Sequence, residues 1–173
     1  EMIIANLCKY DETLNERYLP NGAYTFLTMH NGTRINSKVN RRDTALFTMY
    51  NLHGVGGGQL GTAIRRLDDL KHIVPANIYI RSHTHMAETH DGKLMVIEKQ
   101  KRDIIEEKCV FASNGAFLRY GGYAQKGQMG IPSTSTPIFT LGVKRNVYRK
   151  ANEEKYSEYN EKLIECVLRD KDW

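Results

Sequence analysis

The stretch TALFTMYNLHGVGGG, residues 44–58, decides the fold because it joins a buried strand to a glycine-rich loop. Residues 44–50 are mostly apolar or β-branched, which predicts a strand covered on both faces. Over residues 59–72, apolar side chains recur at the spacing of a helix. A second apolar run at 76–80 predicts another strand. Strand, helix and strand form a βαβ crossover, which makes the two strands parallel.

The remaining strands are expected mostly in hairpins. Asn31-Gly32 and Asp91-Gly92 are strong hairpin-turn signals. Expected strands, including those on either side of the two turns, are 23–29, 33–38, 86–89, 93–98, 109–113 and 137–143. The sum is an α/β fold, a mixed β-sandwich flanked by helices, with ligands expected beyond the carboxyl ends of the parallel strands.

The two ends and one long loop complete the expected organisation. Residues 2–9 and 152–169 carry apolar side chains at helical spacing, and residues 114–135 are rich in glycine and hydroxyl side chains. We expect a main domain over residues 1–145 and a carboxyl-terminal helical extension over 146–173.

Composition limits the class of protein. With 173 residues, of which 40% are hydrophobic, the chain fits one globular domain. It has no apolar run long enough to span a membrane, so no membrane partner is expected. Its three cysteines are far apart, which favours a reducing, cytoplasmic location. A net charge of +5 is compatible with a polyanionic partner such as nucleic acid, although acidic residues alternate with the basic ones.

Histidines follow both strands of the crossover. His53 comes after the first strand, and His83 and His85 come after the second, in the run IRSHTHM. Because the carboxyl ends of parallel strands meet at one edge of a sheet, the three imidazoles are candidate metal ligands. The alternative is that they are hydrogen-bonded structural residues.

The glycine loop after His53 has two interpretations. Consecutive glycines before a helix allow the backbone to approach an anion such as phosphate, and Gly57 and Gly58 are the candidates. The loop matches neither the phosphate-loop pattern nor the dinucleotide fingerprint, and a flexible connector is the alternative.

In this order, the motifs resemble a known family. His53-Gly54, then Ser82-His83-Thr84-His85, then Asn114-Gly115-Ala116 look like the carboxyl-terminal half of the calcineurin-like metallophosphoesterases, and phage-encoded members are the most similar. That family has a His-Gly motif, a Gly-His-x-His motif and an Asn-Pro-Gly-Ser or Asn-Thr-Gly-Ser turn. The resemblance covers roughly residues 45–142.

The resemblance implies an αββα four-layer fold and hydrolysis of phosphate mono- or diesters, including a nuclease activity. It implies two divalent metal ions, such as Mn, Fe, Zn or Ni, with His53 and His83 as ligands of one ion and His85 of the other. The expected substrate-binding residues are Gly54 and Asn114, together with Gly57 and Gly58, which come from the glycine loop and not from the family's motifs. No catalytic residue is assigned. A phage-encoded member would act in the host cytoplasm.

One departure from the family is an absence. The Asp-x-His, Gly-Asp and Gly-Asn-His motifs, which supply the carboxylate and asparagine ligands, do not occur before His53. We therefore expect a fragment or split enzyme that is inactive alone and that associates with a complementary amino-terminal half or with itself. Competing interpretations are a non-catalytic metal- or nucleic-acid-binding module and a structural subunit.

Overall fold

The computed structural model of the chain describes residues 22–30, 44–54, 62–98, 102–116, 121–126, 131, 133–149 and 156–170. Two helices and seven strands lie within these residues. In chain order they are β1 (Ala23–His30), β2 (Thr44–Leu52), α3 (Thr62–Leu70), β3 (Ile78–Arg81), β4 (Glu88–Glu98), β5 (Asp103–Ser113), α4 (Tyr123–Lys126), β6 (Thr136–Arg149) and β7 (Tyr156–Arg169).

A mixed sheet of five strands, in the order β1-β2-β3-β5-β4, forms the centre of the fold. The strands β2, β3 and β5 are parallel, and the edge strands β1 and β4 run antiparallel to their neighbours. The predicted βαβ crossover is confirmed, because α3 joins the parallel pair β2 and β3. Parallel strands need such a crossover, since a short turn cannot return the chain to the same end of the sheet.

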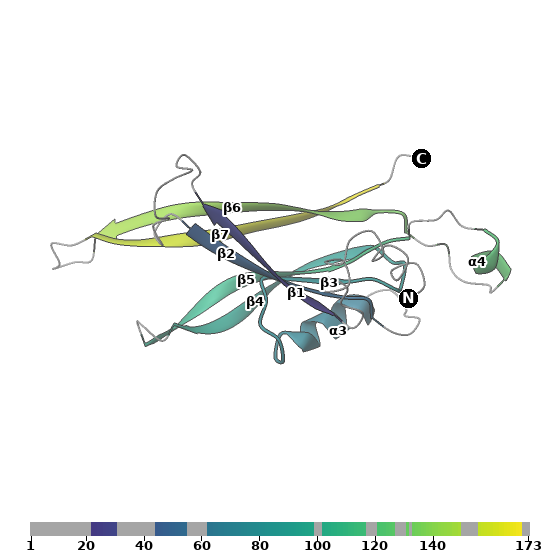
Figure 1. The fold of residues 1–173 in the computed structure, drawn as a ribbon, viewed down its shortest axis with the longest axis horizontal. Helices are drawn as coiled ribbons and strands as arrows, with labels where there is room; N and C mark the ends of the chain where they lie inside the picture. Colours follow the sequence, from purple (N-terminus) through teal and green to yellow (C-terminus); the bar gives the residue numbers. More distant parts are fainter. Residues whose placement is uncertain are drawn as a thin grey trace, which may run out of the picture.

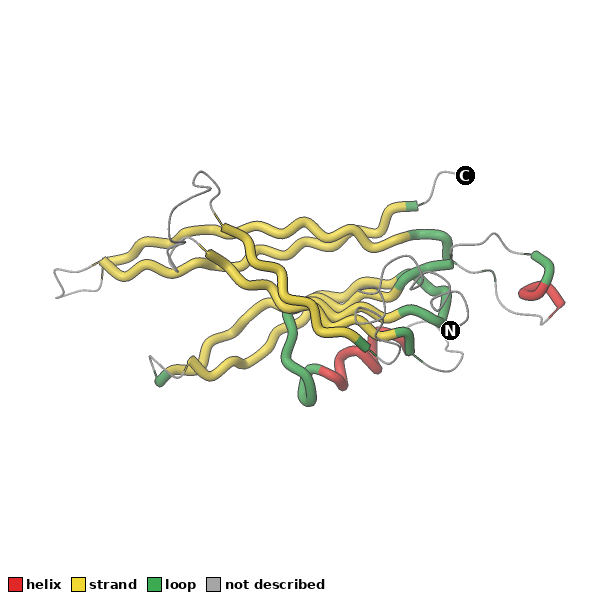
Figure 2. The backbone as a smooth tube through the Cα atoms, in the orientation of Figure 1, coloured by secondary structure: helices red, strands yellow, loops and turns green. Residues whose placement is uncertain are grey.

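The sheet is covered on both faces, by α3 on one side and by the hairpin of β6 and β7 on the other (Figures 1 and 2). Successive side chains of a strand point to opposite faces of the sheet, so neighbouring residues contact different layers. In β3, Ile78 packs with Ile164 of the hairpin, whereas Tyr79 packs with Leu67 of α3. All three of Ile78, Tyr79 and Leu67 are fully buried. The runs of apolar residues in β2, β3 and β5 follow from this burial on both faces.

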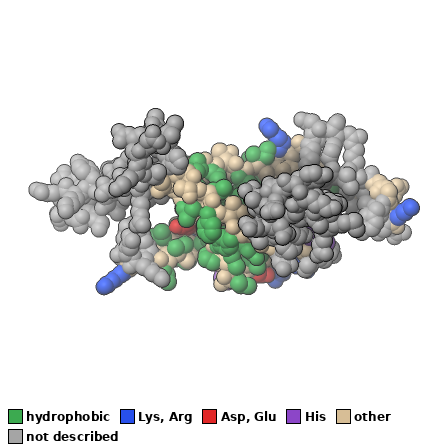
Figure 3. Space-filling model, viewed as in Figure 1, with side chains coloured by type: hydrophobic (Ala, Val, Ile, Leu, Met, Phe, Trp, Pro, Cys, Tyr) green, Lys and Arg blue, Asp and Glu red, His purple; other side chains and the backbone are tan. Residues whose placement is uncertain are grey.

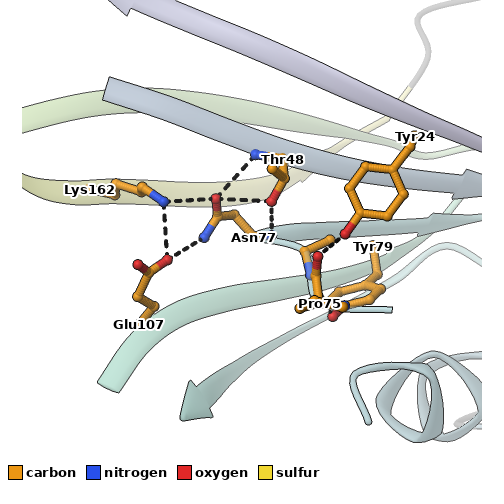
Figure 4. Close-up of polar contacts among 8 residues, drawn as sticks. Tyr24, Thr48, Pro75, Asn77, Tyr79, Glu107 and Lys162 are labelled. Carbon is orange, nitrogen blue, oxygen red and sulfur yellow. Dashed lines mark hydrogen bonds and ion pairs between the residues drawn. The ribbon is translucent and has the colours of Figure 1, made fainter. Parts of the chain in front are cut away.

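A polar network fastens the hairpin to the sheet at the start of β3 (Figure 4). The Oδ1 atom of Asn77 accepts hydrogen bonds from the backbone N–H and the hydroxyl of Thr48 and from Nζ of Lys162. Glu107 accepts from both Asn77 and Lys162, each at 3.0 Å. Asn77 is only 3% exposed, so these bonds satisfy a polar group that would be costly to bury alone.

Apolar side chains also remain on the surface. Figure 3 shows hydrophobic side chains gathered over the middle of one face. Phe26 of β1, Leu46 of β2 and Ile73 are among the exposed hydrophobic residues. In the described ranges, none of the helices is long and apolar enough to cross a membrane.

The hairpin turn predicted at Asp91-Gly92 is wrong. The strand β4 runs straight through both residues and pairs with β5 from Glu88 opposite Ser113 to Glu98 opposite Asp103. Gly92 serves packing instead, because a Cβ there would lie 2.6 Å from Cε2 of Phe111. The ring of Phe111 occupies the space that a side chain would need.

The helix predicted over residues 152–169 is also wrong where the structure describes it, because Tyr156–Arg169 is the strand β7. Pairing with β6 along its whole length supplies the backbone hydrogen bonds. Burial of Ile164, 3% exposed, against the sheet fixes which face points inward. The boundary expected between residues 145 and 146 falls inside β6, so the hairpin crosses it.

The other predicted elements divide into two groups. The strands expected at 23–29, 44–50, 76–80, 109–113 and 137–143, and the centre of the helix at 59–72, are confirmed with small shifts of their ends. The helix expected at 2–9 and the strand expected at 33–38 lie outside the described residues. The mixed sheet between α3 and the hairpin agrees with an α/β sandwich.

Candidate functional site

Three chain segments leave the sheet side by side at the carboxyl ends of its parallel strands. Leu52 is aligned with Arg81, and Arg81 is aligned with Ser113. His53, the Ser82-His83-Thr84-His85 segment (the histidine loop) and Asn114 follow these residues directly. Parallel pairing therefore places all three motifs at one edge, as expected for a ligand site in an open α/β sheet.

His53 and His83 are in direct contact at this edge. Nε2 of His53 and Nδ1 of His83 are 3.1 Å apart, and the two rings meet edge to face with centroids 5.0 Å apart. Both side chains are exposed. One imidazole nitrogen of each residue therefore points into the same accessible space.

The backbone of the histidine loop is strained. His83 has a φ of 81° and His85 a φ of 57°, both in the left-handed region that non-glycine residues rarely adopt. Such conformations cost free energy and persist only where the surroundings hold them.

Hydrogen bonds to β5 and to the segment before β6 hold the loop. Nδ2 of Asn114 donates to Oγ of Ser82 at 3.1 Å, and the hydroxyls of Thr84 and Ser113 are 3.3 Å apart. The carbonyl of His85 accepts from the N–H of Ser133 at 3.1 Å. Ser82 and Thr84 thus turn towards the protein while His83 and His85 remain exposed.

The side chain of Arg81 packs so closely against Gly54 that no larger residue fits at position 54. The φ of Gly54 is 83°, and a Cβ at this position would lie 2.3 Å from Nε of Arg81. Arg81 is only 2% exposed. Burial, and then the nearby charge of Arg66, lower the pKa of the Arg81 guanidinium. The buried side chain of Arg81 therefore packs directly beneath the turn that carries His53.

The segment after Asn114 is packed tightly against the residues before β6. Gly115 donates to the carbonyl of Ser135 and Ala116 to that of Ser133, at 3.1 and 2.6 Å. A Cβ on Gly115 would lie 2.4 Å from the Ser133 carbonyl oxygen, so only glycine fits there. The Ser135 hydroxyl also donates to the carboxylate of Asp170, just after β7.

The structure brings some of the predicted site residues together. His53 and His83 touch, Gly54 lies beside them, and Asn114 is bonded to the histidine loop. Gly57 and Gly58 lie outside the described residues. His85 belongs to the same loop, but among the described residues no group of three His, Cys, Asp or Glu side chains could hold a metal ion.

Sequence reasoning missed the supporting residues. Arg81, Thr84 and Ser113 were not singled out, although the alternation in SHTH hints that Ser82 and Thr84 would share one side of the loop. No local sequence pattern identifies Ser113, the partner of Thr84, because the two come together only through the pairing of β3 with β5.

The contact between His53 and His83 suits one metal ion. Two imidazole nitrogens bound to Zn²⁺ at about 2.0–2.1 Å, with an angle of about 100° between them, would be about 3.1 Å apart. The 3.1 Å separation of Nε2 and Nδ1 agrees with this geometry. A hydrogen bond between one protonated and one unprotonated ring nitrogen is the other chemistry that this distance allows.

Comparison with known proteins found no family model, no curated protein and no solved structure that matches the chain.

Proposed function

We propose that the chain forms the carboxyl-terminal part of a metal-dependent phosphoesterase that hydrolyses phosphate mono- or diesters. The observation that carries this proposal is the 3.1 Å contact between Nε2 of His53 and Nδ1 of His83. It joins the ends of two adjacent parallel strands, with Asn114 at the end of the third. The order of the His-Gly, His-x-His and Asn-Gly motifs along the chain supports the same proposal.

His53 and His83 would hold one divalent metal ion, and His85 would serve a second. A pair of such ions, when bound, activates water and offsets the charge of the phosphoryl group.

The missing ligands define a further part of the proposal. Neutral imidazoles alone do not offset the charge of two close cations, and the chain lacks the family's Asp-x-His, Gly-Asp and Gly-Asn-His motifs before His53. We propose that a complementary protein segment supplies the carboxylates and completes a four-layer αββα fold. The mixed sheet and the hairpin would then belong to its two β layers.

The basic charge extends the proposal to the substrate. A net charge of +5 is compatible with a polyanionic partner, so a nucleic-acid phosphodiester is included among the candidate substrates.

Metal binding tests the site directly. Metal binding can be measured by calorimetric titration of the purified chain with Ni²⁺ or Mn²⁺. His53→Ala and His83→Ala should each weaken binding by about tenfold or more, because each removes one of two ligands and loss of a residue that merely orients a ligand already has an effect of that size. His72→Ala is the matched control, because His72 is an exposed histidine in the turn after α3, away from the carboxyl ends of the parallel strands. Equal binding by all four proteins would contradict the site.

Hydrolysis of bis(4-nitrophenyl) phosphate with Mn²⁺ tests the chemistry. We expect little turnover from the chain alone and turnover when a segment with the missing motifs is added. Activity in that mixture should be lost with His83→Ala. Metal binding without turnover in any such mixture would favour the non-catalytic module.

A further inference from the structure

The histidine loop alternates between anchored and presented residues. Ser82 and Thr84 are partly buried and hydrogen-bonded to the end of β5, whereas His83 and His85 are exposed. Both histidines have positive φ, so the loop does not hold this shape through its own backbone preference. Something outside the loop must maintain it.

The bonds to the end of β5 are suited to that task. Asn114 is fixed to β3 by its own backbone, because its N–H donates to the carbonyl of Arg81 at 2.9 Å. Its side chain then reaches Ser82 at 3.1 Å. Ser113, the partner of Thr84, is fully buried at the end of a paired strand. The anchors are therefore more rigid than the loop that they hold.

We propose that Ser82 and Thr84, through Asn114 and Ser113, are positioning residues that keep His83 in the strained conformation in which it meets His53. This inference rests on the proposed function, since its consequence is metal affinity. The resembling family has glycine where this chain has Ser82, and glycine cannot make the bond to Asn114. The bond from Asn114 to Ser82 is thus a way of holding the loop that a glycine loop does not have.

The proposal assigns Asn114 a role other than substrate contact. Its Nδ2 atom already donates to Ser82. Without that donor, the Ser82 side chain loses its tie to β5, and the loop gains freedom to relax away from positive φ. The two ring nitrogens would then spend less time 3.1 Å apart, and a metal would have to restore the contact on binding.

A double-mutant cycle on Ni²⁺ affinity tests the anchors. Ser82→Ala and Asn114→Ala should each weaken binding about tenfold, the range seen when residues that orient metal ligands are removed. The double variant should be no weaker than either single one, because both changes remove the same bond. Ser82→Thr keeps the hydroxyl and should restore affinity. Thr84→Val should weaken binding by a similar factor.

A control separates positioning from general stability. Thr48→Val removes the hydroxyl that donates to Oδ1 of Asn77 and accepts from the N–H of Asn77, near the opposite end of β3. It should lower the melting temperature and leave the Ni²⁺ affinity of the folded protein unchanged. If Ser82→Ala and Thr84→Val bind Ni²⁺ as tightly as the unaltered chain while His53→Ala and His83→Ala do not, the positioning role is wrong and the metal site stands. If His53→Ala and His83→Ala also keep full affinity, the proposed function fails with it.

Discussion

Lys162 of β7 and Glu107 of β5 form an ion pair of 3.0 Å where the hairpin rests on the sheet, with about a quarter of each side chain exposed (26% and 27%). A shorter pair, Lys93 with Glu106 at 2.6 Å, lies in the open with 71% and 56% exposure. The two pairs share the same chemistry and differ in solvent access. Comparing the two pairs therefore tests how far solvent exposure changes the contribution of an ion pair to stability.

Lys162→Met should destabilise the protein by about 1–3 kcal/mol, because it leaves the Glu107 carboxylate half-buried without its cation and removes a donor from Asn77. Lys93→Met should cost less than about 0.5 kcal/mol, since water screens the exposed pair. Urea unfolding measures both. Equal losses would mean that the network does not fasten the hairpin.

Gly54→Ala should destabilise the protein by about 2–3 kcal/mol, through the strain of a non-glycine residue at φ 83° and the clash with Arg81. Gly142→Ala is the matched control. A Cβ at Gly142 would meet Leu163 at 3.6 Å, an ordinary contact, so this change should be neutral or slightly stabilising. Thermal unfolding of the two variants distinguishes a required glycine from a replaceable one.

The strain at His85 can be measured without a metal. At φ 57°, glycine is tolerated better than any L-residue, so His85→Gly should be more stable than His85→Ala by about 1 kcal/mol. Denaturant midpoints of the two metal-free variants give the difference. A more stable alanine variant would indicate that the loop does not have this backbone conformation in solution.

Alkaline pH should weaken the fold. Burial raises the pKa of the Cys109 and Cys166 thiols from 9.0 to about 11. Because the folded pKa is the higher one, the unfolded chain loses these protons first. Their contribution is full below about pH 9 and is lost as the pH rises through about 11.

Denaturant unfolding midpoints measured between pH 8 and pH 11 would show this loss of stability. Cys166→Val removes one thiol at similar volume and should make the decline shallower. Burial also raises the pKa of Tyr79, to about 12. The stability of Cys166→Val should therefore still decline at alkaline pH, although less steeply. An unchanged slope in Cys166→Val would show that this thiol ionises equally in both states.

The sequence alone predicted those elements whose apolar pattern matches their burial and whose neighbours in the fold follow directly along the chain. The crossover from β2 through α3 to β3 could be predicted because apolar runs and a 3.6-residue period stand in sequence order. The shared edge of His53 and His83 follows from that crossover alone. The spacing of Tyr156, Tyr159, Leu163 and Val167 fits a helix equally well, and only the partner β6 turns it into a strand.

Long-range packing accounts for the rest. Gly92 resembles a turn glycine until the ring of Phe111 is placed above it. The bond from Asn114 to Ser82 joins residues 32 positions apart, and no periodic pattern records it. The strain at His83 is likewise a product of these anchors and not of residues 82–85 by themselves.

The position of β3 has a consequence for the order of folding. It is four residues long, and both of its neighbours are parallel, so each must be brought to it from far along the chain. The hairpins of β4 with β5 and of β6 with β7 close over short separations, and contacts of low sequence separation form sooner. Amide protons of the two hairpins should therefore become protected before those of β3 during refolding. The edge that carries the histidines would be the last part of the sheet to reach its native form.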